Sequence, residues 1–210
     1  MKKLISITMM LMVSFCFAQK KQSQKPAHKA KSKLEFGFKA GGNYSRITGD
    51  DETRYFSSKI GYHAGLLVKY DMHNNLGMQA ELLWNVLGTN SKDKQDENIK
   101  GKIKMDYISL PILLQYELIP RLYLETGPEF SYNISSKFIF EDGRVTDWQE
   151  YTKSMNFAWG LGAGYYITSN IAVNLRMNLG IATPFFSTEN RYAKSFRHQN
   201  LQFGLLYLIR

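Results

Sequence analysis

Most of the chain alternates between apolar residues and small or polar residues with a period of two. Successive side chains of a β-strand point to opposite faces, so each alternating segment predicts a strand with one apolar face. Eight segments show this pattern: 34–41, 60–70, 76–86, 108–116, 122–132, 157–166, 171–180 and 201–210.

The connections between these segments alternate in length. Short connections follow the second, fourth and sixth segments, at 71–75, 117–121 and 168–170. Long polar connections follow the first, third, fifth and seventh, at 45–59, 88–101, 135–153 and 181–199. Tight periplasmic turns and long extracellular loops are typical of outer-membrane barrels. We therefore predict an all-β fold: an eight-stranded antiparallel up-and-down transmembrane β-barrel of the outer-membrane type, with both termini in the periplasm.

The small face of each segment indicates that the apolar face lies outside. Glycines such as Gly37, Gly65 and Gly162 fall opposite the large apolar residues. The lumen of an eight-stranded barrel is just wide enough for side chains to fill, so many inward positions must be small. A soluble barrel would instead turn its apolar side chains inward. The uncharged stretch 154–175 suggests a membrane helix as an alternative, but the polar residues 168–170 are better explained as a turn.

The first 18 residues predict a secretory signal peptide. Two lysines precede the apolar run 4–17, and small residues at positions 16 and 18 fit cleavage after Ala18. Lipidation of Cys16 is the alternative, although the bulky Phe15 before it does not suit that processing. Cleavage after Ala18 would remove the only cysteine, so the mature chain would hold no disulfide and no cysteine-ligated metal.

The formal net charge of +9 is concentrated before the barrel. Eight lysines precede Leu34, which leaves 19 Lys and Arg against 18 Asp and Glu in residues 34–210. Residues 19–33 are rich in Lys, Gln and Ser and predict a disordered basic periplasmic linker, because they cannot bury enough apolar surface to fold. Attraction of this linker to an anionic surface is the alternative to simple solvation. Nucleic-acid binding is not expected, because a nucleic-acid-binding domain carries its positive charge on a folded face.

Several charged residues point into the predicted lumen. By the alternation they are Lys39, Glu81, Glu125, Glu129 and Arg176. Because buried charges must be matched, we interpret them as a structural cluster that fills the lumen, with an ionic relay as the alternative. Glu81, Glu125 and Arg176 lie about three to five residues from the short turns, and Lys39 falls at a comparable height. We therefore predict an Arg176-centred cluster that closes the lumen to ions.

The long third and fourth loops carry a candidate binding surface. They combine aromatic side chains with arginines, as binding surfaces do. Packing among the loops, or contact with lipopolysaccharide, explains these residues equally well. They are Phe138, Phe140, Arg144, Trp148, Tyr151, Phe185, Phe186, Arg191, Tyr192, Phe196 and Arg197.

No catalytic, cofactor-binding or metal-binding residues are predicted. The four histidines, at positions 28, 63, 73 and 198, show no spacing typical of a metal pair. A nucleophile and base near His198 would be needed for an outer-membrane hydrolase, but nothing in the sequence places them together. The glycine run 160–164 lacks the third glycine of a dinucleotide fingerprint and the lysine of a phosphate-binding loop. We expect a protein without a cofactor that is not an enzyme.

Four pieces of the chain carry a family resemblance: 107–116 (YISLPILLQY), 122–128 (LYLETGP), 160–165 (GLGAGY) and the signal ending at 17–19 (FAQ). Residues 34–210 resemble the outer-membrane β-barrel family abundant in Bacteroidota and often called PorT-like. The resemblance implies a barrel in a Gram-negative outer membrane. Its name-giving member is associated with protein secretion and gliding, whereas most relatives share only the barrel.

The last predicted strand resembles the signal that the barrel-assembly machinery reads. Gln202, Gly204, Tyr207 and Ile209 fit it, and Arg210 stands where an aromatic residue is usual. This resemblance implies the machinery as a partner during insertion, beside outer-membrane lipid, lipopolysaccharide and an envelope protein partner. We therefore expect a small porin-like barrel that serves envelope structure or binds through its loops. A component of a secretion or envelope-assembly complex and an outer-membrane enzyme are the alternatives.

Overall fold

Nearly all described residues of the computed structural model lie in β-strands. The structure describes residues 33–48, 56–72, 74–92, 100–147, 149–151, 154–181 and 197–209, so the predicted signal and almost all of the predicted linker lie outside the described residues. The eight long strands are β1 (Lys33–Thr48), β3 (Lys59–Asp71), β4 (Leu76–Lys92), β5 (Lys100–Ile119), β6 (Leu122–Phe140), β8 (Met155–Tyr166), β9 (Ile171–Gly180) and β10 (Arg197–Ile209). The short elements are β2 (Phe56–Ser57), β7 (Val145–Asp147) and the 3-10 helix η2 (Gln149–Tyr151).

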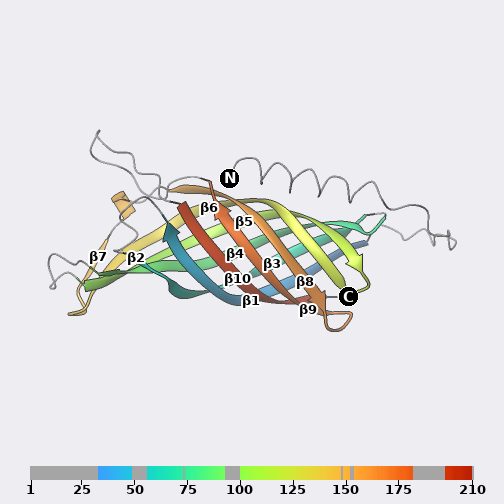
Figure 1. Cartoon of the computed structure of the whole chain (residues 1–210), viewed down its shortest axis with the longest axis horizontal. Coiled ribbons are helices and arrows are strands. Elements are labelled where there is room, and N and C mark those ends of the chain that lie inside the picture. Colours follow the sequence, from blue (N-terminus) through green and yellow to red (C-terminus); the bar gives the residue numbers. More distant parts are fainter. Residues whose placement is uncertain are drawn as a thin grey trace, which may run out of the picture. The chain divides into compact units, whose positions relative to one another are not determined.

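The eight long strands close into an up-and-down barrel (Figure 1). Each pairs antiparallel with the strand before it and the strand after it in the chain. The pairing of β1 with β10, from Phe36 opposite Ile209 to Thr48 opposite Arg197, joins the two ends of the sheet. The predicted eight-stranded antiparallel barrel is therefore confirmed. Within the described ranges, no helix has both the length and the apolar character needed to cross a membrane.

The burial pattern of the barrel is inverted relative to that of a soluble protein. Phe36, Leu82 and Leu175 point outward and are about half exposed, whereas Glu81 and Arg176 point inward and are at most 1% exposed. Such an apolar exterior is stable when lipid hydrocarbon, rather than water, surrounds it. From the short turns as far as Asp106 on β5, the inward and outward side chains of all eight strands follow the alternation read from the sequence.

One end of the barrel, which we call the turn end, is closed by tight connections. Asn74 and Asn75 both have φ of 62°, as a two-residue hairpin turn of type I′ requires, and asparagine tolerates this conformation. Arg121 adopts φ of 74° in the turn between β5 and β6. The long connections lie at the opposite end, which we call the loop end.

Strands β4, β5 and β6 extend farther toward the loop end than the sequence pattern predicts. They contain 17, 20 and 19 residues, against 10 in β9. Residues 88–92 and 135–140, expected in loops, are strand residues. The short strands β2 and β7 pair with β4 and β6 in this extension, at the left in Figure 1. The loops expected at 88–101 and 135–153 are therefore shorter than predicted, because cross-strand pairing continues through part of each.

A β-bulge in β6 reverses its alternation near the loop end. Tyr107 pairs with Asn133 and the adjacent Asp106 pairs with Ser135, which leaves Ile134 as an extra residue. An extra residue in one strand moves every later side chain to the opposite face. Below the bulge the odd-numbered residues of β6 point inward, and above it Ser136 and Phe138 do.

Candidate functional site

Arg176 lies at the centre of a fully buried charge network in the lumen. Its Nη1 and Nη2 donate to the two carboxylate oxygens of Glu81 at 2.9 and 2.7 Å, and its Nε donates to Glu125 Oε1 at 2.7 Å. In the ring of eight strands, β9 with Arg176 lies directly opposite β4 with Glu81. The planar guanidinium offers donors in a fixed fork, which lets one arginine bridge two carboxylates. This contact therefore spans the lumen.

Lys39 adds a second cation to the network from β1. Its ammonium group donates to the Glu81 carboxylate oxygens at 3.1 and 3.3 Å. The two cations and the two carboxylates balance, as buried charges require. The structure thus brings together the four residues of the predicted Arg176-centred cluster.

Neutral amides satisfy the remaining carboxylate lone pairs. Gln79 donates to Glu81 at 2.6 Å, Asn174 donates to Glu125 at 3.1 Å, and Gln115 donates to Glu125 at 3.2 Å. A hydrogen bond from Gln115 to Gln79 at 3.1 Å links the groups around Glu125 to those around Glu81. Such a network holds its long side chains in one arrangement, because each donor or acceptor left unpaired would be costly.

Inward glycines make room for the charged side chains. A Cβ atom at Gly162 would lie 3.0 Å from Glu125 Oε1 and 2.6 Å from the backbone oxygen of Leu175. A Cβ atom at Gly204 would lie 2.8 Å from Lys39 Cε. The glycine-rich inner face read from the sequence therefore surrounds the network and leaves the lumen filled by long polar side chains.

Glu129 stands apart from this network, although it was grouped with it at the sequence level. Its carboxylate accepts from Asn178 Nδ2 at 2.8 Å and from Ser131 Oγ at 3.3 Å. No ion pair between described residues includes it. Glu129 lies four residues farther from the turn end than Glu125, which puts it at a different height in the lumen.

A layer of amide, hydroxyl and imidazole groups lies beside the charge network. His63 Nδ1 and Asn43 Oδ1 are 2.9 Å apart, and Asn43 donates to Asn85 at 3.3 Å. Asn85 donates to Ser109 at 2.8 Å, and Ser109 and Ser131 share a hydrogen bond of 2.8 Å. This layer could not be predicted from the sequence, because uncharged polar residues give no sign of a shared height until the strand register is known.

A small apolar cluster covers the polar interior on the side of the extended strands. It comprises the buried residues Leu87, Ile103, Met105, Tyr107 and Phe138. Phe138 is 5% exposed, so the structure places it inside the barrel rather than on the expected loop surface. The bulge at Ile134 is the reason, because it turns Phe138 from the outer to the inner face.

Only part of the candidate loop surface is described. Phe140 is half-buried against the apolar cluster, its ring lies 4.6 Å from that of Phe138, and the Arg144 guanidinium lies 5.1 Å from its ring centre. Arg144 also bonds Asp142, and the hydrogen bond from the Arg144 backbone amide holds the pKa of Asp142 below its usual range. Tyr151 lies in η2 and Arg197 begins β10. The remaining loop candidates lie outside the described residues: Trp148, Phe185, Phe186, Arg191, Tyr192 and Phe196.

The residues of the proposed assembly signal all lie in β10. Gln202 and Gly204 face the lumen, whereas Tyr207 and Ile209 are about half exposed on the outer face. Gln202 donates to Asn85 at 3.3 Å, so it also belongs to the polar interior. Arg210 lies outside the described residues.

The described residues do not assemble a metal centre of three or more His, Cys, Asp or Glu side chains. His63 is 1% exposed and its Nδ1 contacts Asn43, which fits a packing residue. The other three histidines lie outside the described residues or have undescribed side chains.

Sequence comparison identifies the family of this barrel. Residues 17–185 match the family described as outer membrane protein beta-barrel domain. The chain belongs to this family. The apolar exterior and the closed polar lumen of the fold agree with an outer-membrane location for the family member described here. A search of curated proteins gives no match.

Solved structures with a similar fold are small barrels. Neisserial surface protein A shares 13% identity, with 82% of this chain and 96% of that chain covered and a TM-score of 0.55. Ail, the attachment invasion locus protein of Yersinia pestis, shares 16% identity, with 83% and 98% covered and a TM-score of 0.48. Outer membrane protein W of E. coli shares 16% identity, with 87% and 100% covered and a TM-score of 0.45. At 13% identity, the likeness to neisserial surface protein A concerns the fold alone.

Proposed function

We propose that this outer-membrane barrel does not conduct ions and that it serves the envelope through its loop end, as a structural component or by binding. The observation that carries the proposal is the Arg176–Glu81 contact, which joins opposite walls of the lumen. A pore needs a continuous polar path that water can fill. Here Arg176, Glu81, Glu125 and Lys39 bind one another and are at most 1% exposed.

Solute flux into liposomes tests this proposal. Liposomes that contain the refolded barrel should exclude a small sugar as well as protein-free liposomes do, whereas liposomes with a general porin should swell. Swelling of the barrel liposomes at the rate of the porin sample would contradict the proposal.

Three lysines support envelope anchoring as the more specific role. Lys102 and Lys137 are exposed on the outer face of the β5–β6 extension, and Lys104 is partly exposed there. Lys104 lies directly opposite Lys137 across the strand pair, and like charges in that position repel. Asp106, 3.7 Å from the Lys104 ammonium, and Asp147, opposite Lys137 on β7, offset part of this repulsion. The apolar exterior begins below them on β5, at Ile108 and Leu110. A phosphate group of the outer-leaflet glycolipid would reach this height and relieve the repulsion.

Lipid-dependent stability tests this anchoring. Adding lipopolysaccharide to phosphatidylcholine vesicles should raise the unfolding temperature of the wild type. The rise should be lost in the triple variant Lys102→Gln, Lys104→Gln, Lys137→Gln and kept in the matched triple variant with arginine. Equal rises in all three proteins would show that these lysines do not bind the glycolipid.

We propose that the turn end faces the periplasm. In support, β1 begins at Lys33, opposite Asp71, and β10 ends at Ile209, opposite Phe36, so both ends of the barrel sequence emerge at the turn end. Short turns face the periplasm in outer-membrane barrels. An epitope tag inserted within residues 93–99, between β4 and β5, should be accessible on intact cells, and a tag after Gln19 should become accessible only after permeabilisation. The reverse pattern would contradict this orientation.

A role in a secretion or envelope-assembly complex is the rival proposal. It rests on the resemblance of 107–116, 122–128 and 160–165 to the PorT-like family. Affinity purification from detergent-solubilised membranes distinguishes the two, because stoichiometric envelope proteins would favour the rival. We further propose that the protein is not an enzyme, since the charged side chains of the Arg176 network bind one another and are at most 1% exposed.

A further inference from the structure

Glu129 differs in its partners from Glu81 and Glu125, the two carboxylates of the Arg176 network. Glu81 and Glu125 bind Arg176, whereas Glu129 accepts only from Asn178 and Ser131 among described residues. It is 7% exposed. A buried carboxylate is stable only when a cation, a proton or several hydrogen-bond donors compensate its charge. Two neutral donors leave Glu129 short of that compensation.

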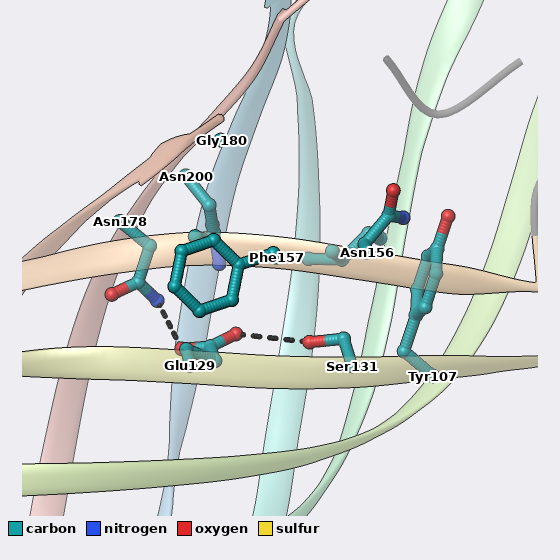
Figure 2. A pocket seen from close by; sticks show the side chains of 10 residues that line it. Tyr107, Glu129, Ser131, Asn156, Phe157, Asn178, Gly180 and Asn200 are labelled. Carbon is teal, nitrogen blue, oxygen red and sulfur yellow. Dashed lines mark hydrogen bonds between the residues drawn. The ribbon is translucent and has the colours of Figure 1, made fainter. Parts of the chain in front are cut away.

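A cavity of about 30 Å³ lies beside Glu129 in the loop half of the lumen (Figure 2). Its polar lining comes from Tyr107 of β5, Glu129 and Ser131 of β6, Asn156 of β8, Asn178 of β9 and Asn200 of β10. A space of this size has room for one water molecule or one small ion. Figure 2 shows Glu129 on the cavity wall between Asn178 and Ser131, which hold its two carboxylate oxygens.

Amide oxygens without partners line the same cavity. Oδ1 of Asn178, Asn200 and Asn156 is buried and has no hydrogen-bond partner. Asn178 and Asn200 are 3% and 4% exposed. The orientation of the Asn178 amide follows from its contact with Glu129, because a carboxylate accepts and only Nδ2 can donate to it. Buried carbonyl oxygens normally have a donor or a cation as partner.

We infer that this cavity is a binding site for a monovalent cation, namely sodium or potassium. The polar lining offers carboxylate, amide and hydroxyl oxygens and neither sulfur nor imidazole, which is the donor set of hard cations. A single carboxylate matches one positive charge. Divalent calcium usually takes several carboxylates among six to eight oxygens, and magnesium demands strict octahedral geometry. The ion would neutralise Glu129, and Oδ1 of Asn200 and of Asn156 would supply further ligands. Asn178 Oδ1, by contrast, lies over Gly160, and only the Nδ2 of Asn178 contacts Glu129.

The site would give Glu129 a positive partner, which the basic side chains of the Arg176 network do not supply. Arg176 and Lys39 balance Glu81 and Glu125, and the bound ion would balance Glu129. The hydroxyl pair Ser131–Ser109 connects Glu129 to Asn85 in the layer of amide, hydroxyl and imidazole groups. The ion would therefore stabilise the loop half of the lumen. This inference does not depend on what the loops bind.

Side-chain amide NMR of the refolded barrel in micelles tests the inference. Sodium or potassium chloride replaces N-methylglucamine chloride at constant ionic strength, because N-methylglucamine is too large for the cavity. The amide resonances of Asn178 and Asn200 should shift and saturate with one or both ions. The shift should vanish in Glu129→Gln and persist in Glu117→Gln, which changes an exposed carboxylate at the turn end.

A second measurement uses the wild type alone, in case Glu129→Gln does not fold. Crystals soaked in rubidium chloride should show an anomalous-scattering peak within coordination distance of Glu129 and Asn200. If the cavity holds only water, or if Glu129 is protonated, neither a saturable shift nor an anomalous peak will be seen, and the inference is then overturned. A saturable shift that persists in a folded Glu129→Gln variant would also overturn it.

Discussion

Replacement of Arg176 by alanine tests the lumen network most sharply. The change removes three hydrogen bonds of 2.7–2.9 Å and leaves Glu81 and Glu125 buried with Lys39 as the remaining ion-pair partner of the cluster. Removal of one partner from a buried ion pair costs about 3–5 kcal/mol. That corresponds to roughly two to four orders of magnitude in the folding equilibrium. We expect the loss near the upper end, because one arginine serves two carboxylates.

Urea unfolding in lipid vesicles measures this loss. The fluorescence of Trp84 and Trp159, which lie about half exposed on the outer face, reports the transfer of the strands from lipid to water. The exposed Glu141→Ala variant is the control and should change the free energy of unfolding by at most about 1 kcal/mol. An Arg176→Ala barrel within 1 kcal/mol of the wild type would refute the reasoning.

A neutral variant separates the effect of charge from the effect of volume. It combines Arg176→Met, Lys39→Met, Glu81→Gln and Glu125→Gln. Replacement of a whole buried ion cluster by hydrophobic residues of similar volume is often neutral or stabilising. Glutamine is used at positions 81 and 125 because its carbonyl oxygen still accepts from Gln79, Asn174 or Gln115. We therefore expect this variant to recover most of the stability lost in Arg176→Ala. If it were as unstable as Arg176→Ala, lost packing rather than unmatched charge would explain both results.

Three further predictions concern assembly of the barrel. Leu82→Arg and Leu175→Arg should each impair membrane insertion, because an outward arginine near the bilayer midplane costs about 2–4 kcal/mol. Wild-type yields of folded protein for both variants would show that the assignment of inner and outer faces is wrong. Gly162→Leu should lower the unfolding temperature by displacing Glu125, whereas the outward Ala40→Leu control should not; equal melting temperatures would contradict this. N-terminal sequencing of the outer-membrane fraction should start at Gln19, and a lipid-modified Cys16 would be the opposing result.

The alternation of residues predicted the barrel and its two faces, because a strand assigns each side chain to a face by position alone. It also grouped Arg176, Glu81, Glu125 and Lys39, which the structure brings together, but it included Glu129, which the structure places apart. Arg176, Glu81 and Glu125 lie at similar distances from the short turns, and the lumen is narrow enough for their long side chains to meet across it. The turn residues, such as Asn74 and Asn75, supply the fixed points from which these heights are counted.

Two features could not be predicted from the pattern. The bulge at Ile134 reverses the faces of β6, so Phe138 lies in the apolar cluster although its position in the sequence suggested a loop. The partners of Glu129 depend on the register between β6, β8 and β9, which places Asn178 and Asn156 near it. Neither feature leaves a local signal, because both arise from pairing between separate strands.

Electrical recording from planar lipid bilayers tests the central claim most directly. The claim is that the network of Arg176, Glu81, Glu125 and Lys39 closes the lumen of this outer-membrane barrel. The wild-type barrel, inserted at a density verified by fluorescent labelling, should carry no steady current above that of the bare bilayer in 1 M potassium chloride. Stable unitary currents from the wild type would contradict the account.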